Sequence, residues 1–487
     1  MRRLASDSVI YGLGSVANQA LSFLLLPLYT QYLTPSDYGT LALLGAAGGV
    51  LALIVNAGVQ SGLTRIFFDY ENEDDRAAVV FTAIAFTVVT TIAFTVPLYL
   101  GADSLTPLLF DPPDRAAAVP LMQLAILIYS LSALNGAALA VLQVYRRPAA
   151  YVACSALGLV ASLGLTIYLV AAAGRGLTGV LEGQLAGIVL QAGLALAASL
   201  PQLRLRLSLA ALGRMLAFSV PLLPTNLAAW VLGLADRWFL KEYASFAEVG
   251  LYALGFRFGS VLETLFIRPF TLAWFPYLFS ILNDPDHPKI CARVLEYYTL
   301  VGSSLVLVLS LFGGDVIRLI SDPSYLGAES VIYWIGLGCL LRGMTFVTVA
   351  GINIRQKTHY SAVVYVAGVA VNLALLRVLV PRYGTLGAAI AMVVTHLAMT
   401  AAMGWIAQRL YPIPYRPLRV GLVIALMSAL YFAGRAAAPS ALLPGLAVKA
   451  LFAAAFPGVL LATGFFDRAE IERARALLRR LGARSAG

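Results

Sequence analysis

The stretch Ser36–Leu43, SDYGTLAL, recurs 211 residues later as Ala247–Leu254, AEVGLYAL. In each copy an acidic residue stands two positions before a glycine, and Ala-Leu begins three positions after that glycine. Each copy follows a long apolar segment with an asparagine near its middle, Asn18 in the first and Asn226 in the second. The chain is therefore predicted to be built from a doubled unit.

Two further stretches repeat at nearly the same distance. Arg146–Tyr151 corresponds to Arg355–Tyr360, and the turn Gly176–Gly179 corresponds to Gly384–Gly387. The offsets run from 208 to 211 residues, so the matches share one register. The period covers six predicted helices, and an even number of helices leaves both halves in the same orientation. We therefore expect a pseudo-twofold axis along the membrane normal and a midplane cavity between the halves.

The composition is that of a membrane protein. Of the 487 residues, 60% are hydrophobic and 12% are charged, and the mean hydropathy is +0.84. Apolar runs of about 20 residues, long enough to cross roughly 30 Å of hydrocarbon as helices, recur along the chain. They predict about fourteen spans, near residues 8–33, 38–62, 77–100, 117–144, 149–173, 176–200, 213–236, 249–270, 293–313, 326–350, 360–380, 384–407, 417–435 and 442–465.

The predicted fold is an all-α polytopic membrane protein with two pseudo-symmetric six-helix lobes. The N-lobe is assigned to residues 1–205, the C-lobe to 206–410, and two further transmembrane helices to 411–466. Residues 467–487 are predicted to form a basic amphipathic tail, with a solvated basic terminus as the alternative. With the N-terminus inside, 22 Lys and Arg residues fall in cytoplasmic segments and eight on the other side. The charge bias therefore predicts that both termini are cytoplasmic.

No catalytic or metal-binding pattern is found in the sequence. Cys154, Cys291 and Cys339 are isolated and the three histidines are scattered, so no metal site and no cofactor are predicted. The pattern Asp284-Pro285-Asp286 lies in a short loop and is interpreted as a turn. No Walker motif occurs, which excludes ATP hydrolysis by this chain, and no nucleic-acid partner is expected.

Polar residues follow one face of two predicted spans. Ser15, Asn18 and Ser22 lie on the first span, and Ser219 and Asn226 lie on the seventh. Small polar residues often join helices through hydrogen bonds worth about 0.6 kcal/mol each. Their placement in equivalent helices of both halves favours the other interpretation, which is a polar stripe facing a wet cavity.

Arginines inside apolar runs are the strongest functional signal. Arg257 and Arg268 are eleven residues apart on the eighth span, which in an α-helix places them on one face about 16 Å apart. Arg342 lies inside the tenth span. A central arginine costs roughly 2.5–3.5 kcal/mol, so it is expected to face a partner or water. Snorkelling is an equal alternative for Arg268. With Arg65 and Arg237, these residues predict a cationic chamber suited to phosphate or diphosphate.

Three acids within or beside spans are candidates for ion coupling. They are Glu182, Asp236 and Glu263. Asp236 could equally pair with a nearby cation and Glu263 with a neighbouring helix. Lys449 lies in the last span, outside the repeat; it could line a lipid-facing groove, but snorkelling at the helix end is the favoured interpretation.

The opening of the chain resembles a known family. The segments Tyr11–Ser15, Leu24–Thr30, Tyr32–Pro35 and Asp37–Gly39 are similar to the start of the polysaccharide (oligosaccharide) flippases. These form the Wzx-type branch of the multidrug/oligosaccharidyl-lipid/polysaccharide (MOP) exporter superfamily. The arginine-rich first helix of the lipid II flippase branch is absent, since nothing between Arg3 and Arg65 is basic.

The resemblance implies a MATE-like fold whose two lobes open alternately to either side. It implies movement of undecaprenyl-diphosphate-linked oligosaccharide from the inner to the outer leaflet of the bacterial cytoplasmic membrane. The product would serve the biosynthesis of cell-surface polysaccharide, either lipopolysaccharide or exopolysaccharide. Besides the lipid bilayer, the implied partners are a polysaccharide polymerase and chain-length machinery.

Three alternatives differ in the features they require. A multidrug or cation antiporter of the same fold should have an intramembrane carboxylate cage and usually twelve spans. A membrane O-antigen polymerase or ligase should carry a large external loop, whereas the longest one here, around 101–116, is too short to fold alone. A structural scaffold would not need charged residues inside both halves. The sequence therefore favours a flippase, which is a transporter and not an enzyme.

Overall fold

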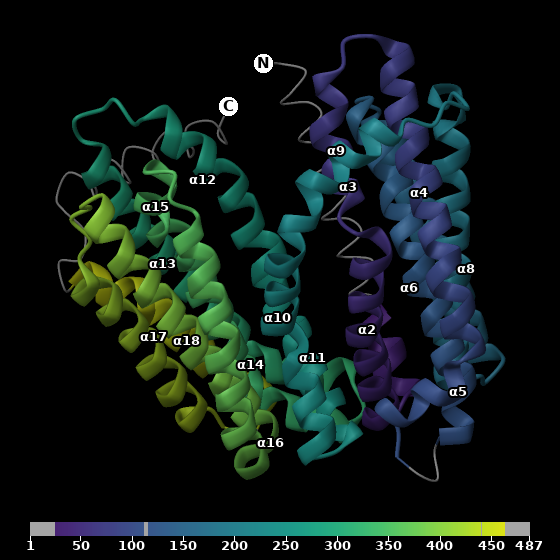
Figure 1. Cartoon of the computed structure of the whole chain (residues 1–487). Helices are drawn as coiled ribbons and strands as arrows, with labels where there is room; N and C mark the ends of the chain where they lie inside the picture. The colour runs from purple at the N-terminus through teal and green to yellow at the C-terminus, as the bar shows by residue number, and fades with distance from the viewer. Residues whose placement is uncertain (1–24, 112–114, 440, 463–487) are drawn as a thin grey trace, which may run out of the picture. The chain divides into compact units, whose positions relative to one another are not determined.

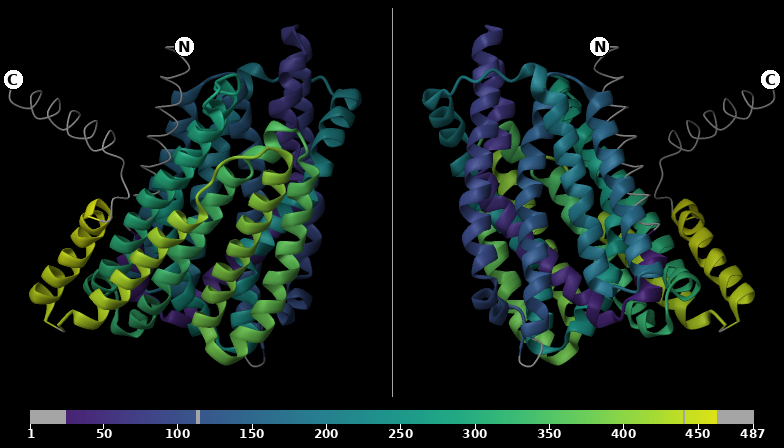
Figure 2. Two further views of the ribbon diagram at one scale, coloured as in Figure 1. Left: turned by 90° about the vertical axis from the view of Figure 1, so that its left-hand side faces the viewer. Right: turned by 90° about the vertical axis from the view of Figure 1, so that its right-hand side faces the viewer.

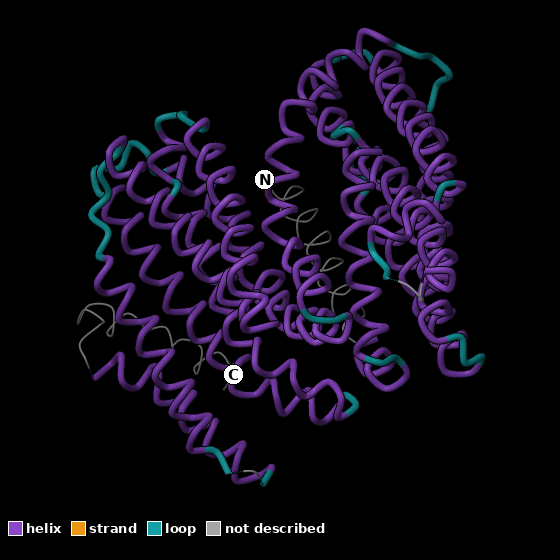
Figure 3. The backbone as a smooth tube through the Cα atoms, turned by 60° about the horizontal axis from the view of Figure 1, so that its bottom comes forward, coloured by secondary structure: helices purple, strands orange, loops and turns teal. Residues whose placement is uncertain are grey.

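The computed structural model of the protein describes residues 25–111, 115–439 and 441–462. Over these ranges the chain consists of helices joined by short loops, without any strand (Figure 1 and Figure 3). Within these described ranges, twelve helices are long and apolar enough to cross a membrane. The predicted all-α, multi-pass membrane fold is therefore confirmed. Ser15, Asn18 and Ser22, most of the span predicted at 8–33 and the predicted tail after Asp467 lie outside the described residues.

The helices follow one another with few breaks. The first part of the chain contains α2 (Pro35–Asn56), α3 (Val59–Ile66), η1 (Phe67–Asp69), α4 (Glu73–Leu100), α5 (Ala102–Leu105), η2 (Thr106–Leu108), α6 (Arg115–Val144), α7 (Pro148–Ile167), η3 (Tyr168–Ala172), α8 (Gly176–Ser199) and η4 (Leu200–Gln202). The middle contains α9 (Leu209–Ser219), η5 (Val220–Leu222), α10 (Leu223–Tyr243), α11 (Phe246–Leu262), η6 (Glu263–Ile267) and α12 (Arg268–Ser280). The last part contains α13 (His287–Ile320), η7 (Pro323–Ala328), α14 (Glu329–Thr348), α15 (Ala350–Ile354), α16 (His359–Leu410), α17 (Pro417–Ala437) and α18 (Leu442–Ala462).

One of the twelve long helices contains two of the predicted spans. Helix α16 has 52 residues, about twice the length that a membrane requires. Its backbone leaves the helical region at Gly384, where φ is 53° and ψ is −131°. A missing side chain at Gly387 also lets the backbone fold back, since a Cβ there would lie 3.1 Å from the amide N of Val380. The spans predicted at 360–380 and 384–407 therefore meet at this turn.

The described chain divides into two compact units, each with its own interior. The first unit contains residues 1–254, 320–327 and 365–391, and the second contains 255–319, 328–364 and 392–487. In the first, α6 packs along α2, α4 and α8. In the second, α17 and α18 lie side by side as the last helix pair, visible in yellow-green and yellow in Figure 2. The division into lobes at 205 and 410 stays a prediction.

The repeated acid has the same structural position in both copies. In the first copy the Asp37 amide donates to the hydroxyl of Thr34 (3.2 Å), and the Thr34 amide donates to the Asp37 carboxylate (3.0 Å). In the second copy the amide of Glu248 donates to the hydroxyl of Ser245 (3.2 Å). Helices α2 and α11 are thus capped by a hydroxyl three residues before the acid, as orphan amides at a helix start require.

The repeated glycine marks a contact between the two copies. A Cβ on Gly39 would lie 2.9 Å from the amide N of Gly250 and closer still to the carbonyl O of Phe246. A Cβ on Gly250 would lie 3.0 Å from the amide N of Gly39 and closer still to the carbonyl O of Pro35. The contact is reciprocal, because Pro35 and Phe246 are themselves equivalent at the offset of 211 residues. A local twofold axis passing between two equivalent segments produces such reciprocity.

Two turns repeat in backbone detail as well. Gly176 and Gly384 both have positive φ, 52° and 53°. Arg146 and Gln356, with φ of 50° and 56°, are the matching left-handed residues of the other turn. In both copies of this second turn, the residue after the left-handed one donates a backbone hydrogen bond. The Arg147 amide donates to Leu142 O (2.8 Å), and the Lys357 amide donates to Ile352 O (3.0 Å). By backbone conformation, Arg146 therefore matches Gln356, an offset of 210 residues. The sequence match of Arg146 with Arg355 has an offset of 209.

Candidate functional site

The span predicted at 249–270 lies within a helical run of 35 residues, Phe246–Ser280, which contains a π-helical turn. Helix α11 passes through η6 into α12 without leaving the helical region. The π turn at Glu263–Ile267 widens the helix locally, and each inserted residue rotates the next part of the helix by about 100°. Arg257 precedes this turn and is half-buried, whereas Arg268 comes after it and is exposed. Because the π turn lies between the two arginines, the single shared face expected from α-helical spacing stays a prediction.

Glu263 and Arg342 form an ion pair inside the second unit. Glu263 is the first residue of the π turn. The guanidinium of Arg342, on α14, donates to its carboxylate. The two side chains are 36% and 24% exposed. The expectation that Arg342 faces a partner is confirmed, and that partner is one of the acids predicted for ion coupling. A proton or cation binding to Glu263 would compete with this arginine.

Aromatic rings line the helix beside this pair. The Tyr298 ring lies 4.9 Å from the Phe266 ring and 4.7 Å from the Phe270 ring, measured between centroids. The Trp274 ring stacks on Phe270 at 6.0 Å, and its indole N–H donates to Phe346 O (3.1 Å). We did not predict this cluster. The spacing of Phe266, Phe270 and Trp274, four residues apart, is the sequence signal that could have found it.

Arg268 differs from Arg342 in its surroundings. It is exposed, and it makes no ion pair with any residue that the structure describes. It comes directly after the π turn, within the stretch Phe246–Ser280 that is apolar enough to span a membrane. A guanidinium in this setting has donors to offer to water, a lipid head group or a transported anion.

The two arginines predicted in the first unit are both paired. Arg65 of α3 contacts the Asp69 carboxylate, which also binds Arg214 at 2.7 Å. Arg237 of α10 is 6% exposed, and it donates to Asp236 (2.8 Å) and to Gly233 O (3.0 Å). A ligand of the Arg237 guanidinium would therefore compete with Asp236 for a buried cation. The predicted pairing of Asp236 with a nearby cation is thus what the structure has.

The remaining predicted polar residues differ in their surroundings. Ser219 is buried, and its hydroxyl donates to Met215 O (2.7 Å). It packs against Gly62, where a Cβ would come within 2.7 Å of the hydroxyl. Asn226 is exposed. Glu182 pairs with Arg175 at 2.7 Å. Within the described ranges, no three His, Cys, Asp or Glu side chains gather as metal ligands would.

Lys449 does not snorkel. Its ammonium donates to the Asp315 carboxylate of α13 (2.6 Å), and its side chain is 14% exposed. Lys449 belongs to a second group of charged residues in the second unit, which does not include Glu263 or Arg342. The interpretation of Lys449 as an end-of-helix snorkelling residue is therefore wrong.

Comparison with protein families and solved structures gives one family and one fold. The family model described as "Polysaccharide biosynthesis protein" matches residues 30–328. No curated protein matches the chain by sequence. Among solved structures, the lipid II flippase MurJ in an inward closed conformation aligns with a TM-score of 0.75, over 94% of this chain and 100% of its own, at 11% identity.

Multidrug transporters share the same fold. An inward-facing MATE family transporter of the MOP superfamily aligns with a TM-score of 0.66, over 84% of this chain and 98% of its own, at 13% identity. The Vibrio cholerae MATE transporter VcmN aligns with a TM-score of 0.57, over 84% of this chain and 96% of its own, at 15% identity. The MATE-like fold expected from the sequence is therefore confirmed.

Proposed function

The chain belongs to the polysaccharide biosynthesis protein family, and from that premise we propose that it is a flippase for undecaprenyl-diphosphate-linked oligosaccharide. It moves this lipid from the inner to the outer leaflet of the bacterial cytoplasmic membrane by alternating access. The observation that carries the proposal is the set of arginines within apolar helices of the second unit, Arg257, Arg268 and Arg342. They suit a diphosphate better than a drug cation.

The physical obstacle in such a reaction is the head group. A hydrophilic glycan on a charged diphosphate cannot cross hydrocarbon unaided, because burying unpaired charge is prohibitively unfavourable. Arginines in a wet cleft remove that barrier while the lipid tail remains in the bilayer. A negative interior favours outward movement of the anion by about 2.3 kcal/mol per charge per 100 mV. The membrane potential is thus sufficient as a driving force in this scheme.

Each residue has a role in the proposal. Arg268 makes the first contact with the diphosphate because its donors are already exposed. Arg342 can exchange Glu263 for the phosphate, which ties substrate binding to the charge state of that carboxylate. Arg257 contributes positive potential from within the helix. The cavity roles of Arg65, Arg237, Asn18, Ser15, Ser22, Asn226 and Ser219, and coupling roles of Asp236 and Glu182, remain predictions.

Location and partners are inferred from the same reaction. The substrate is assembled at the cytoplasmic leaflet and consumed outside, so the protein would work in the cytoplasmic membrane with both termini inside. A polymerase and chain-length machinery would receive the product. The proposal makes the protein a transporter and assigns it no chemical step.

Reconstituted transport tests the proposal directly. Liposomes would contain the full chain, a fluorescent lipid-diphosphate oligosaccharide and a set membrane potential, and a membrane-impermeant quencher would report the leaflet. We expect Arg268→Gln to slow flipping about tenfold or more, since one charge-assisted contact to phosphate is worth about 1.5–3 kcal/mol. Lys289→Gln is the matched control, because Lys289 is exposed, lies in the same unit and forms an ion pair with Asp286, three residues before it (2.8 Å).

Two outcomes would contradict the proposal. Wild-type protein that leaves the lipid on its original leaflet while exchanging drug cations for protons would be a multidrug antiporter of the same fold. Equal flipping rates for Arg268→Gln and Lys289→Gln would show that Arg268 does not contact the substrate. Because Arg268 makes no ion pair with the described residues, its substitution should not disturb folding.

A further inference from the structure

A second group of charged residues surrounds a cavity at the ends of four helices of the second unit. The cavity has a volume of about 250 Å³. Its wall comes from α13, the first residue of α14, the end of α17 with the residues after it, and α18. Two other cavities, in the first unit, are lined almost wholly by apolar side chains. We call this one the charged cavity. It is lined by Arg318, Glu329, Tyr431, Arg435 and Lys449, and Asp315 pairs with two of these cations.

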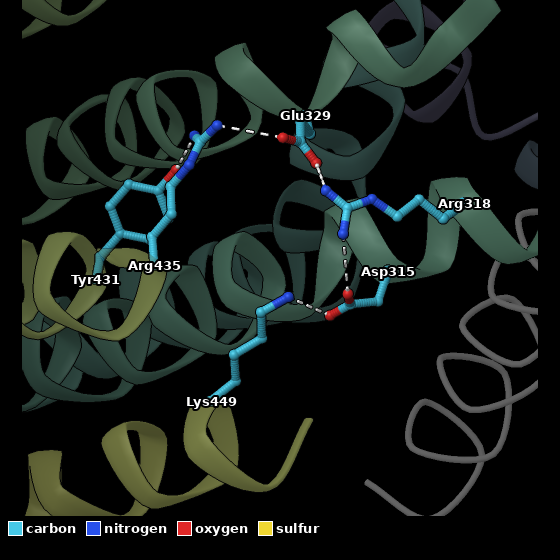
Figure 4. A network of polar contacts seen from close by, with 6 residues as sticks. All are labelled: Asp315, Arg318, Glu329, Tyr431, Arg435 and Lys449. Atoms are coloured by element: carbon cyan, nitrogen blue, oxygen red, sulfur yellow. Dashed lines mark hydrogen bonds and ion pairs between the residues drawn. The ribbon is translucent and has the colours of Figure 1, made fainter. Parts of the chain in front are cut away.

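These six side chains form one open chain of contacts, drawn in Figure 4. The Arg435 guanidinium donates to Tyr431 Oη (3.1 Å) and to Glu329 Oε1 (3.2 Å). Arg318 donates to Glu329 Oε2 (3.1 Å) and lies 3.9 Å from Asp315 Oδ1. The chain ends where Lys449 donates to Asp315 Oδ2 (2.6 Å). Glu329 therefore holds two guanidinium groups in fixed positions on either side of itself.

The charges of the cavity do not cancel. Three cations meet two carboxylates, so the group carries one excess positive charge. The carboxylates are covered, with side chains 12% exposed for Asp315 and 26% for Glu329. The two arginines are half exposed, at 50% and 49%. An approaching molecule thus meets guanidinium groups first, and each of them has five N–H donors, more than its contacts with the described residues engage.

The cavity wall also contains a polar atom without a partner. Ser310 of α13 is 9% exposed and lines the cavity, and its hydroxyl makes no hydrogen bond to any residue that the structure describes. On the same helix, Ser304 instead donates to Leu300 O (2.9 Å). Gly314 lies one turn beyond Ser310, where a Cβ would come within 2.6 Å of Glu329 Oε2. The wall is therefore shaped to admit Glu329 and to leave the Ser310 hydroxyl available.

Attachment of the last helix pair does not depend on these charges alone. The Tyr333 ring of α14 stacks on the Tyr431 ring of α17 at 4.3 Å, with planes 4° apart. The hydroxyl of Tyr333 also donates to Ser428 of α17 (2.7 Å). Half-exposed ion pairs contribute about 0–1 kcal/mol each. A purely structural role thus leaves the excess charge and the unpaired serine hydroxyl without an explanation.

We propose that the charged cavity binds the phosphate group of an anionic ligand. Arg318 and Arg435 contact the phosphate oxygens, and the hydroxyl of Ser310 donates to one of them. A cation is not the ligand, because the cavity already carries excess positive charge. The phosphate can belong to a lipid head group or to free phosphate, since both present the same oxygens. The site differs from the proposed transport residues, and Tyr431, Arg435 and Lys449 lie beyond the residues matched by the family model.

The test uses the purified full chain in a phosphate-free buffer and a non-ionic detergent. Calorimetric titration with inorganic phosphate measures the free-anion arm. Native mass spectrometry after exchange into phosphatidylglycerol nanodiscs measures retained lipid in the other arm. We expect Ser310→Ala to weaken binding about tenfold in the arm that binds, as loss of a hydrogen bond to a charged group implies. Arg435→Gln should weaken it more, and Ser303→Ala should leave it unchanged.

Ser303 is the matched control because it is on the same helix, is fully buried, and also has a hydroxyl without a partner among the described residues. It does not line the cavity. Should Arg435→Gln fail to fold, Ser310→Ala still decides, because it breaks none of the ion pairs. Phosphate binding without lipid retention supports a free-anion site, and lipid retention that phosphate displaces supports a lipid site. Absence of both, or equal affinity of Ser310→Ala and wild type, overturns the proposal.

Discussion

Replacement of Gly39 by alanine tests the contact between the two copies of the repeat. The new Cβ would lie 2.9 Å from the amide N of Gly250 and nearer still to the carbonyl O of Phe246, and both are backbone atoms that no rotamer change can move. Real Cβ atoms essentially never come within 3.0 Å of such atoms. The start of α2 and the start of α11 must therefore move apart. Overpacking of this kind typically costs about 1–3 kcal/mol.

Gly250→Ala should have a similar effect, because it meets the same backbone from the other side. The double variant supplies the sharper measurement. If one contact is opened by either change, the second substitution adds little, so the double variant should cost less than the sum of the single ones by about 0.5–3 kcal/mol. Two independent sites would instead give additive losses.

Thermal and denaturant unfolding of the purified chain in detergent would measure these effects. Gly233→Ala is the control, because a Cβ there would have no atom within 4 Å and Gly233 lies inside α10. Alanine is favoured over glycine in a helix by about 1 kcal/mol, so this variant should be no less stable than wild type. The reasoning would be refuted if Gly39→Ala were as stable as Gly233→Ala, or if the double variant were additive.

The ion pairs, the helix caps and the charge bias give three further predictions. Glu263→Gln and Arg342→Gln should each lower stability because each removes one side of a partly buried ion pair, whereas the double variant should regain stability but not transport; unfolding and flipping assays separate the two. Thr34→Ala should destabilise the chain by about 1 kcal/mol through loss of the α2 cap, as measured by denaturant unfolding. If both termini are cytoplasmic, a membrane-impermeant maleimide should label Ala436→Cys but not Asp284→Cys in intact cells. Wild type is the unlabelled control, because its three cysteines are buried. The opposite labelling pattern would show the reverse orientation.

Sequence periodicity was sufficient to predict the helices and the repeat. Apolar runs gave the positions of the spans, because length and hydropathy are properties that the chain carries without any partner. The reason why the repeated acid and glycine recur could not be predicted. The acid caps a helix start locally, but Gly39 is required by a backbone more than 200 residues away. A sequence repeat identifies such a glycine but does not show which backbone segment packs against it.

The charged residues were predictable as a class and not as pairs. A charged residue in an apolar helix is expected to have a partner. In the structure, Arg342 pairs with Glu263 and Lys449 pairs with Asp315. The register of a π turn cannot be predicted from an α-helical wheel, so the shared face of Arg257 and Arg268 stays a prediction. The cluster around Glu329 was missed because its members lie in four separate helices.

The Glu263–Arg342 ion pair and the charged cavity differ in their charge balance, and this difference fits two different roles in the second unit. Arg342 and Glu263 are one cation and one acid, so they are electrically balanced, and an anion that binds Arg342 competes with Glu263 for the same guanidinium. The charged cavity has a third cation beyond its two carboxylates, so an anion can bind there without displacing either acid. A balanced pair suits a step in which binding and release alternate, as transport requires, whereas an unbalanced one suits steady occupancy. Under these proposals, flipping should therefore depend steeply on substitution at Arg342 and only weakly on Ser310→Ala.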